Sequence, residues 1–174
     1  MAERPNGVTM HGQPLTLIGD EVKVGDKAPD FALLDTGLSP VSLSAYAGKA
    51  VVIVSVPSLD TPVCDLETRR FNQEAARLGD RVAVVAVSMD LPFAQKRWCG
   101  AAGVSNVTTL SDHREASFGL GYGFLIKELR LLARAVIVID PGGAIRYVEL
   151  VKEITSEPDY EAALKAVNEC LAGQ

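Results

Sequence analysis

Three cysteines are the most reactive side chains of this 174-residue sequence, and Cys64 has the most distinctive surroundings. Thr61 is suited to cap the start of a helix, and Pro62 fits the first helical position because an N–H there would be unpaired anyway. Cys64 then falls at the third position, where free backbone N–H groups and the helix dipole favour an anion. The sequence therefore predicts a site that stabilises the Cys64 thiolate, with an inert buried thiol as the ordinary alternative.

Two apolar runs and the segment between them must position Cys64. Val51–Val56 is β-branched apart from Ser55 and lacks polar alternation, which is typical of a strand covered on both faces. Residues 63–78 carry an imperfect helical stripe of apolar side chains, and Arg81–Ser88 forms a second apolar run. Because parallel strands need such a crossover, we expect the two runs to be neighbours in one sheet.

The N-terminal part of the chain predicts two extended pairs ahead of the central strand. Val8–Leu17 alternates apolar and polar residues around His11, which indicates a hairpin with His11 in its turn. Phe31–Leu34 and Val41–Leu43 form the second pair, separated by Asp35-Thr36-Gly37. Both pairs are expected to elaborate the main fold.

A second helix is expected after the second apolar run. Ser88 or Asp90 is suited to cap a helix that begins near Pro92 and carries Cys99 close to its end. Val107–Leu110 is expected to add an edge strand. The second thiol is therefore predicted near a helix C-terminus.

The last third of the chain begins with a stretch that has no clean pattern and predicts a mixture of loop and helix. Its Gly119-x-Gly121-x-Gly123 motif lacks the flanking strand and helix of a nucleotide-binding loop and indicates a flexible loop. Ala135–Ile139 and Ala144–Val151 flank turn residues and predict an antiparallel hairpin. Ser156 and Asp159 indicate the start of a last helix.

This order of elements is that of the thioredoxin fold, an α/β architecture, here with an N-terminal β-hairpin extension. The length and the 48% hydrophobic content suit one core, so residues 1–174 are expected to form a single domain. Reductases, transferases, peroxidases and binding modules share this architecture, so fold alone leaves the function open.

Composition argues against several classes of partner. The net charge of -5 opposes binding to nucleic acid or an anionic membrane, and no signal peptide or membrane span is evident. Three cysteines are too few and too odd in number for a secreted disulfide framework, so a cytoplasmic location is expected. His11 and His113 stand apart from other ligand side chains, which gives a metal site little support.

The segment PSLDTPVC places Pro57, Thr61 and Cys64 at the spacing Pro-x-x-x-Thr-x-x-Cys. Here the chain resembles the peroxiredoxins, and in particular their thiol peroxidase branch of atypical 2-Cys enzymes. The segments DLPFAQKRWCG, LARAVIVID and EITSEPDYEAAL are also similar to that branch. The resemblance spans nearly the whole chain and implies a peroxiredoxin-like variant of the thioredoxin fold.

The resemblance implies a catalytic role for five residues. Cys64 would attack a peroxide as thiolate and become a sulfenic acid, with Thr61 holding sulfur and peroxide and Pro57 shielding them from water. Arg134 would stabilise the thiolate and the charge on the leaving oxygen. Cys99 would then form an intramolecular disulfide with Cys64. Without the motif, Thr61 and Pro57 would be ordinary cap and turn residues, and Arg134 a solvated charge at a strand end.

Disulfide formation should require movement, because we do not expect two cysteines in separate helices to have their Cα atoms within about 7 Å of each other. We therefore expect the first helical turn near Cys64 and the segment around Cys99 to unwind on oxidation. Cys170 is expected to be buried filler. Trp98, Phe93 and Tyr122 are expected to line an apolar mouth for alkyl hydroperoxides, or in part to pack the core.

The function implied by the resemblance is a thioredoxin-dependent peroxidase for hydrogen peroxide and organic hydroperoxides. It would need no metal, haem or flavin cofactor and would form a homodimer. The alternative from another class is a redox sensor or thiol-regulated binding protein that uses the same cysteine pair.

Overall fold

Two β-sheets form the framework of the protein in a computed structural model, which describes residues 1–173. The larger sheet has the strand order β11-β10-β5-β6-β7-β3-β4, and the smaller sheet has the order β1-β2-β8-β9. The larger sheet contains β3 (Leu33–Leu34), β4 (Pro40–Val41), β5 (Ala50–Ser55), β6 (Val82–Ser88), β7 (Thr108–Ser111), β10 (Ala135–Ile139) and β11 (Ile145–Leu150). The smaller sheet contains β1 (Glu3–Met10), β2 (Gln13–Ile18), β8 (Leu125–Ile126) and β9 (Leu131–Leu132).

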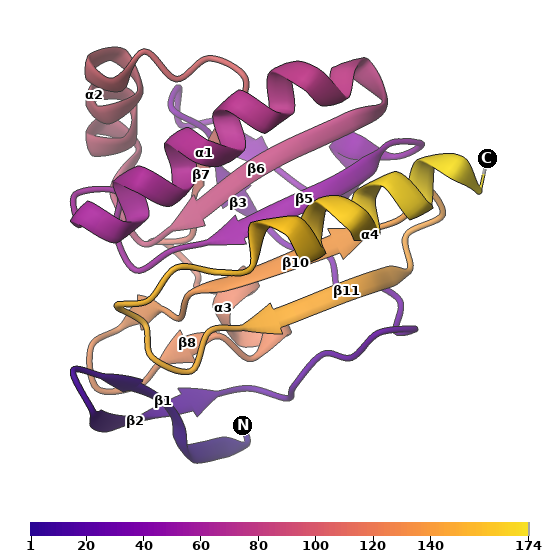
Figure 1. The fold of residues 1–174 in the computed structure, drawn as a ribbon. Helices are drawn as coiled ribbons and strands as arrows, with labels where there is room; N and C mark the ends of the chain where they lie inside the picture. Colours follow the sequence, from indigo (N-terminus) through magenta and orange to yellow (C-terminus); the bar gives the residue numbers. More distant parts are fainter. Residues whose placement is uncertain (174) are drawn as a thin grey trace.

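Helices cover both faces of the larger sheet. In Figure 1, α1 and α4 lie across one face of the sheet, while α3 and the β1–β2 hairpin lie on the other side. The helices are α1 (Pro62–Leu78), α2 (Pro92–Ala102), α3 (Ser117–Tyr122) and α4 (Tyr160–Ala172), with 3-10 turns at Leu43–Tyr46 and Gly79–Arg81. None of the helices within residues 1–173 has the length and apolar character needed to cross a membrane.

Strand β5 is central, as the sequence predicts, and all its residues are buried. It pairs in parallel with β6 and antiparallel with β10. Val52 and Val54 face the core beneath α1 and α4, whereas Val51 and Ile53 face the core that contains α3. Because both faces are covered by apolar groups, the strand needs no polar alternation.

The three predicted hairpins are present. The chain turns between β1 and β2 at His11 and Gly12, which both have positive φ, as a two-residue hairpin turn requires. Strands β10 and β11 pair antiparallel, as do β3 and β4. Strand β3 also pairs with β7, so the second hairpin extends the larger sheet and β7 is an inner strand. The prediction of an edge strand at Val107–Leu110 was therefore wrong.

Two predicted helix starts differ in the structure. The N-cap of α2 is Leu91, which makes no side-chain capping bond, so neither Ser88 nor Asp90 caps this helix. The carboxylate of Asp90 instead accepts hydrogen bonds from Ser58 and Leu59, in the loop before α1. Helix α4 begins after Asp159, whose carboxylate accepts the N–H of Ala162, and Ser156 lies outside the helix.

The predicted flexible glycine loop was also wrong, because Gly119 lies within helix α3. The carboxylate of Asp112 accepts the N–H groups of Phe118 and Gly119, which pairs the free donors of the first helical turns. Burial raises the pKa of Asp112 to about 6, against the lowering effect of these backbone hydrogen bonds. A buried carboxylate outside the motif therefore orders this segment.

Candidate active site

The start of α1 holds Cys64 as the sequence predicts. Thr61 is the N-cap, Pro62 opens the helix, and the N–H of Cys64 donates to the Thr61 hydroxyl oxygen at 3.3 Å. The Cys64 side chain is 0% exposed. Its sulfur therefore lies in a dry environment at the positive end of a helix, where only nearby donors can stabilise a thiolate.

Arg134 supplies the cation beside Cys64. Because β10 runs antiparallel to β5 and pairs Ala135 with Ser55, Arg134 lies beside the end of β5, just before α1. Its Nη2 donates to Cys64 Sγ at 3.2 Å. Arg134 is 2% exposed, so it is not the solvated charge that its position at a strand end would suggest without the motif.

Glu67 is part of this site and was missed in the sequence. Its Oε2 accepts a hydrogen bond from Arg134 Nη1 at 2.5 Å, while Arg134 Nε donates to the carbonyl of Ile154 at 2.8 Å. These contacts fix the guanidinium on three sides. Glu67 lies three residues after Cys64, a spacing that places both side chains on one helical face. That spacing was the available signal.

Burial and the neighbouring charges have opposite effects on the pKa values of Glu67 and Arg134, the two ionisable groups beside Cys64. Burial raises the pKa of Glu67 to about 7, although Arg134 lowers it. Burial also disfavours the charge of Arg134, but Glu67 and Cys64 beside it raise the pKa of Arg134 above its ordinary value. The guanidinium therefore stays charged and faces the sulfur. The second oxygen of Glu67, Oε1, has no hydrogen-bond partner in the described part of the chain.

The loop before α1 is held by Asp90, which the sequence analysis proposed as a helix cap. The carboxylate of Asp90 accepts the Ser58 hydroxyl at 2.7 Å and the N–H of Leu59 at 2.8 Å. The Thr61 hydroxyl donates to the carbonyl of Ser58 at 3.1 Å, and Pro57 is buried. Asp90 therefore fixes the loop that carries two of the predicted site residues.

An apolar pocket of about 340 Å³ opens at this site. The start of α1 forms one side, and the tip of the β1–β2 hairpin with the loop after β11 forms the other. Its lining residues are Met10, His11, Pro57, Thr61, Pro62, Val63, Arg134, Ile154 and Thr155. The pocket gives a small molecule with an apolar group a route to the residues around Cys64.

The three aromatic residues expected at the mouth of this pocket do not line it. Tyr122 is buried in the opposite core beside Phe118, with ring centroids 4.6 Å apart. Trp98 lies against α1, where its Nε1 donates to Asp65 at 2.9 Å. Phe93 is 66% exposed at the start of α2. The apolar mouth comes instead from Met10, prolines and aliphatic side chains that have no aromatic signature.

Cys99 is a free thiol in α2, and Cys64 is also free, so the structure is the dithiol form. The sulfur of Cys99 is 3.5 Å from the Thr109 hydroxyl and is half-buried. Both thiols pack into the core beneath α1, but from different helices. The structure therefore places the two cysteines in one region without joining them.

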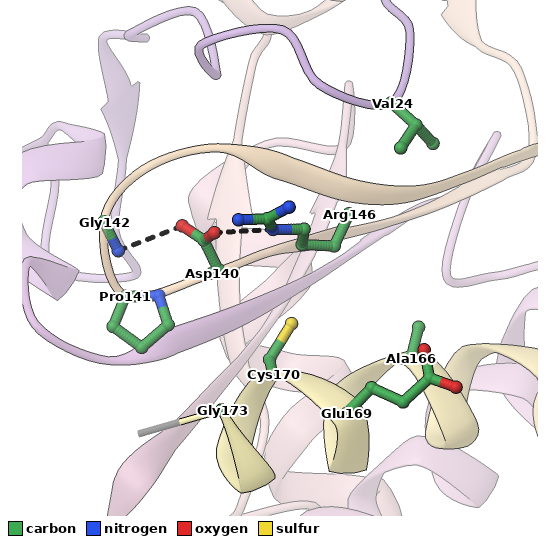
Figure 2. Close-up of a pocket in the computed structure, with 9 residues that line it drawn as sticks. All are labelled: Val24, Asp140, Pro141, Gly142, Arg146, Ala166, Glu169, Cys170 and Gly173. Atoms are coloured by element: carbon green, nitrogen blue, oxygen red, sulfur yellow. Dashed lines mark hydrogen bonds and ion pairs between the residues drawn. The ribbon is translucent and has the colours of Figure 1, made fainter.

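A larger pocket, of about 590 Å³, lies around the third thiol (Figure 2). It is at the opposite end of the sheet, because Ile139 at the end of β10 pairs with Val51 at the start of β5. In Figure 2, Cys170 on α4 lies across the pocket from Asp140 and Arg146, which form an ion pair at 2.6 Å. Cys170 packs against the core beneath α4, as expected, but it is only half-buried because it also lines this pocket.

The charged groups of this larger pocket make no reactive centre. Burial, and then Asp140, raise the pKa of the Cys170 thiol, which disfavours its thiolate. The Asp140 carboxylate already accepts the N–H groups of Gly142 and Ala144 as well as Arg146. Within residues 1–173, no three His, Cys, Asp or Glu side chains are grouped to hold a metal ion.

The chain matches known proteins over most of its length. The profile of the Redoxin family matches residues 23–164. A thiol peroxidase of Halalkalibacterium halodurans is 57% identical over 94% of this chain and 98% of its own length. The thiol peroxidase of Bacillus subtilis is 56% identical over 91% of this chain and 95% of its own.

A solved structure supports the same assignment. The crystal structure of a peroxiredoxin-like protein from Aquifex aeolicus matches with a TM-score of 0.89 and 44% identity, covering 96% of this chain and 99% of that one. The predicted α/β thioredoxin-like fold of the peroxiredoxins is thereby confirmed. On these sequence and structural matches, the chain belongs to the Redoxin family, among the peroxiredoxins of the thiol peroxidase type.

Proposed function

We propose that this protein is a thiol-dependent peroxidase that reduces hydrogen peroxide and organic hydroperoxides at Cys64. The observation that carries the proposal is the hydrogen bond from a buried, charged Arg134 to the Cys64 sulfur at a helix N-terminus. A dry site with a fixed cation favours a thiolate and needs no reorganisation when charge develops on a peroxide oxygen. The thiol peroxidase relatives support the same activity.

The first half of the reaction would oxidise Cys64. Its thiolate attacks the terminal oxygen of the hydroperoxide, the O–O bond breaks, and the hydroxyl group stays on the sulfur. The leaving alkoxide takes up from water the proton that the Cys64 thiol released when it ionised. Arg134 stabilises first the thiolate and then the charge on the leaving oxygen. The Thr61 hydroxyl holds the peroxide, and Pro57 excludes water. The products are the Cys64 sulfenic acid and an alcohol, or water from hydrogen peroxide.

The second half would regenerate the thiol. The Cys99 thiol attacks the sulfenic sulfur of Cys64, water leaves, and an intramolecular disulfide forms. A dithiol reductant, for which we propose thioredoxin, then reduces this disulfide. Because the two cysteines lie in separate helices, we expect the first turn of α1 and the end of α2 to unwind at this step.

The apolar lining of the Cys64 pocket supports organic hydroperoxides as substrates, because an alkyl or aryl group gains by leaving water there. We also propose a homodimer in the cytoplasm. Leu91 and Phe93, both exposed at the start of α2, offer an apolar surface that a second copy would cover.

Coupled turnover with thioredoxin, thioredoxin reductase and NADPH tests the proposal. We expect sustained consumption of hydrogen peroxide and cumene hydroperoxide by the unmodified protein. Cys99→Ser should consume one equivalent of peroxide and then stop, because its sulfenic acid cannot become the intramolecular disulfide. A single oxidation without turnover in the unmodified protein would favour the alternative function, a redox sensor.

A further inference from the structure

The outer wall of the Cys64 pocket is built from two segments that are distant in sequence. Met10 and His11 come from the β1–β2 tip, whereas Ile154 and Thr155 come from the loop between β11 and α4. Thr9 exchanges backbone hydrogen bonds with this loop. The shape of the wall therefore depends on how firmly the hairpin tip is held against the loop.

One carboxylate, that of Glu153, joins the two segments. It accepts hydrogen bonds from the Thr9 hydroxyl at 3.0 Å, from the N–H groups of His11 at 3.2 Å and Gly12 at 2.9 Å, and from the Thr155 N–H at 3.1 Å and hydroxyl at 2.7 Å. Of these partners, His11 and Thr155 line the pocket, and Thr9 and Gly12 are next to lining residues in the chain. Glu153 itself does not line the pocket.

The charge of Glu153 suits this task. The Thr155 hydroxyl and then the Gly12 N–H, with the other donors, lower the pKa of Glu153 to about 2. The side chain is therefore ionised at any pH at which the protein would work, and its hydrogen bonds are charge-assisted. An amide in its place would turn an NH₂ group toward backbone donors and lose part of the set.

We propose that Glu153 is a positioning residue that fixes the hairpin tip as the outer wall of the Cys64 pocket, and so sets selectivity for hydroperoxides with an apolar group. This inference rests on the proposed peroxidase function. An organic hydroperoxide has an apolar group to place against Met10 and Ile154, whereas hydrogen peroxide has none. Loosening the wall should therefore lower the rate constant for an organic hydroperoxide more than the rate constant for hydrogen peroxide.

The test compares Glu153→Gln with the unmodified protein, both full-length and fully reduced. The measurement is the second-order rate constant for loss of the Cys64 thiol in a single turnover, with cumene hydroperoxide and with hydrogen peroxide. The ratio of the two constants should fall about tenfold, the discrimination that one or two apolar contacts supply. Amide hydrogen exchange at His11 and Gly12 should become faster.

Glu128→Gln is the matched control. The two oxygens of the Glu128 carboxylate accept the N–H of Thr16 at 2.9 and 3.0 Å, so Glu128 also holds the β1–β2 hairpin. Glu128 lies in the turn between β8 and β9 and does not line the pocket. Its ratio should equal that of the unmodified protein. Met10→Ala trims the wall without touching Glu153 and should lower the ratio too, which keeps the test decisive if Glu153→Gln does not fold.

Two results would overturn the inference. The first is an unchanged or higher ratio in Glu153→Gln; if both rate constants fell equally, the effect would lie on Arg134 through the Ile154 carbonyl. The second is an unchanged ratio in Met10→Ala. Failure of the proposed function is distinguishable, because the unmodified protein would then leave both peroxides unreacted at Cys64.

Discussion

The chemistry of the site depends on how one guanidinium is shared between a thiol and a carboxylate. Arg134 contacts Cys64 and Glu67 with its two terminal nitrogens. If Glu67 were fully ionised, it would offset the positive charge that the thiolate needs. Burial raises the pKa of Glu67 to about 7 despite Arg134, so near neutral pH the carboxylate is partly protonated. More of the Arg134 charge is then left for the sulfur.

Glu67 should leave a signature in the pH dependence of stability. Its pKa is raised in the folded protein from an ordinary value of 4.5 to about 7. Its contribution to the free energy of unfolding is therefore complete below about pH 4.5 and is lost as the pH rises through about 7. Glu67→Gln removes this titration. In urea unfolding, the variant should lose less stability than the unmodified protein between these two pH values.

The control for this prediction is Glu161→Gln. Glu161 lies on α4 with its side chain 85% exposed, paired only with Arg70 among the ion pairs of the described residues. This variant should keep the pH slope of the unmodified protein. An identical slope in Glu67→Gln would show that Glu67 titrates in the folded protein as it does in the unfolded chain.

At the scale of the elements, hydrogen bonds connect the helix of Cys64 to the helix of Cys99. Asp65, directly after Cys64, accepts the indole N–H of Trp98, directly before Cys99. Arg69 donates to the other oxygen of Asp65 and to the carbonyl of Ala102 at the end of α2. The segments proposed to unwind on oxidation therefore share contacts, so opening one should weaken the other.

Asp65→Ala should speed disulfide formation. Removing the hydrogen bond to Trp98 makes unwinding easier by about 1 kcal/mol, or about fivefold in rate. The measurement is a pulse of hydrogen peroxide followed by acid quenching, alkylation and mass spectrometry of the Cys64–Cys99 disulfide. Glu74→Ala, further along α1, should form the disulfide at the rate of the unmodified protein. A slower or unchanged rate in Asp65→Ala would mean that this bond does not restrain the opening.

Local patterns in the sequence were sufficient for the elements next to Cys64. The buried run of β5, the Thr61 cap and Pro62 all act within a few residues, and their prediction was correct. The position of Arg134 depends on antiparallel pairing between β5 and β10, which no local pattern specifies, so the family resemblance was needed for it. Asp90 was misassigned as a cap because its partners lie in a loop some thirty residues earlier, at Ser58 and Leu59.

At the scale of the whole molecule, the Cys64 pocket and the larger pocket lie at opposite ends of the larger sheet. Cys64 lies beyond the carboxyl end of β5. Cys170 lines the larger pocket, which is near the amino end of β5. The smaller sheet adds its β1–β2 tip to the Cys64 pocket alone, through Met10 and His11. The N-terminal extension thus contributes to the Cys64 pocket, and the larger of the two pockets is not the one beside the thiol proposed to react.

The central claim is that peroxide is reduced at Cys64. The most direct test measures thioredoxin-coupled peroxide consumption by the unmodified protein, by Cys64→Ser and by Cys170→Ser as the matched thiol control. Cys64→Ser should lose all consumption and form no sulfenic acid that dimedone can trap, whereas Cys170→Ser should retain full turnover. Full turnover in Cys64→Ser, or its loss in a folded Cys170→Ser, would contradict the account.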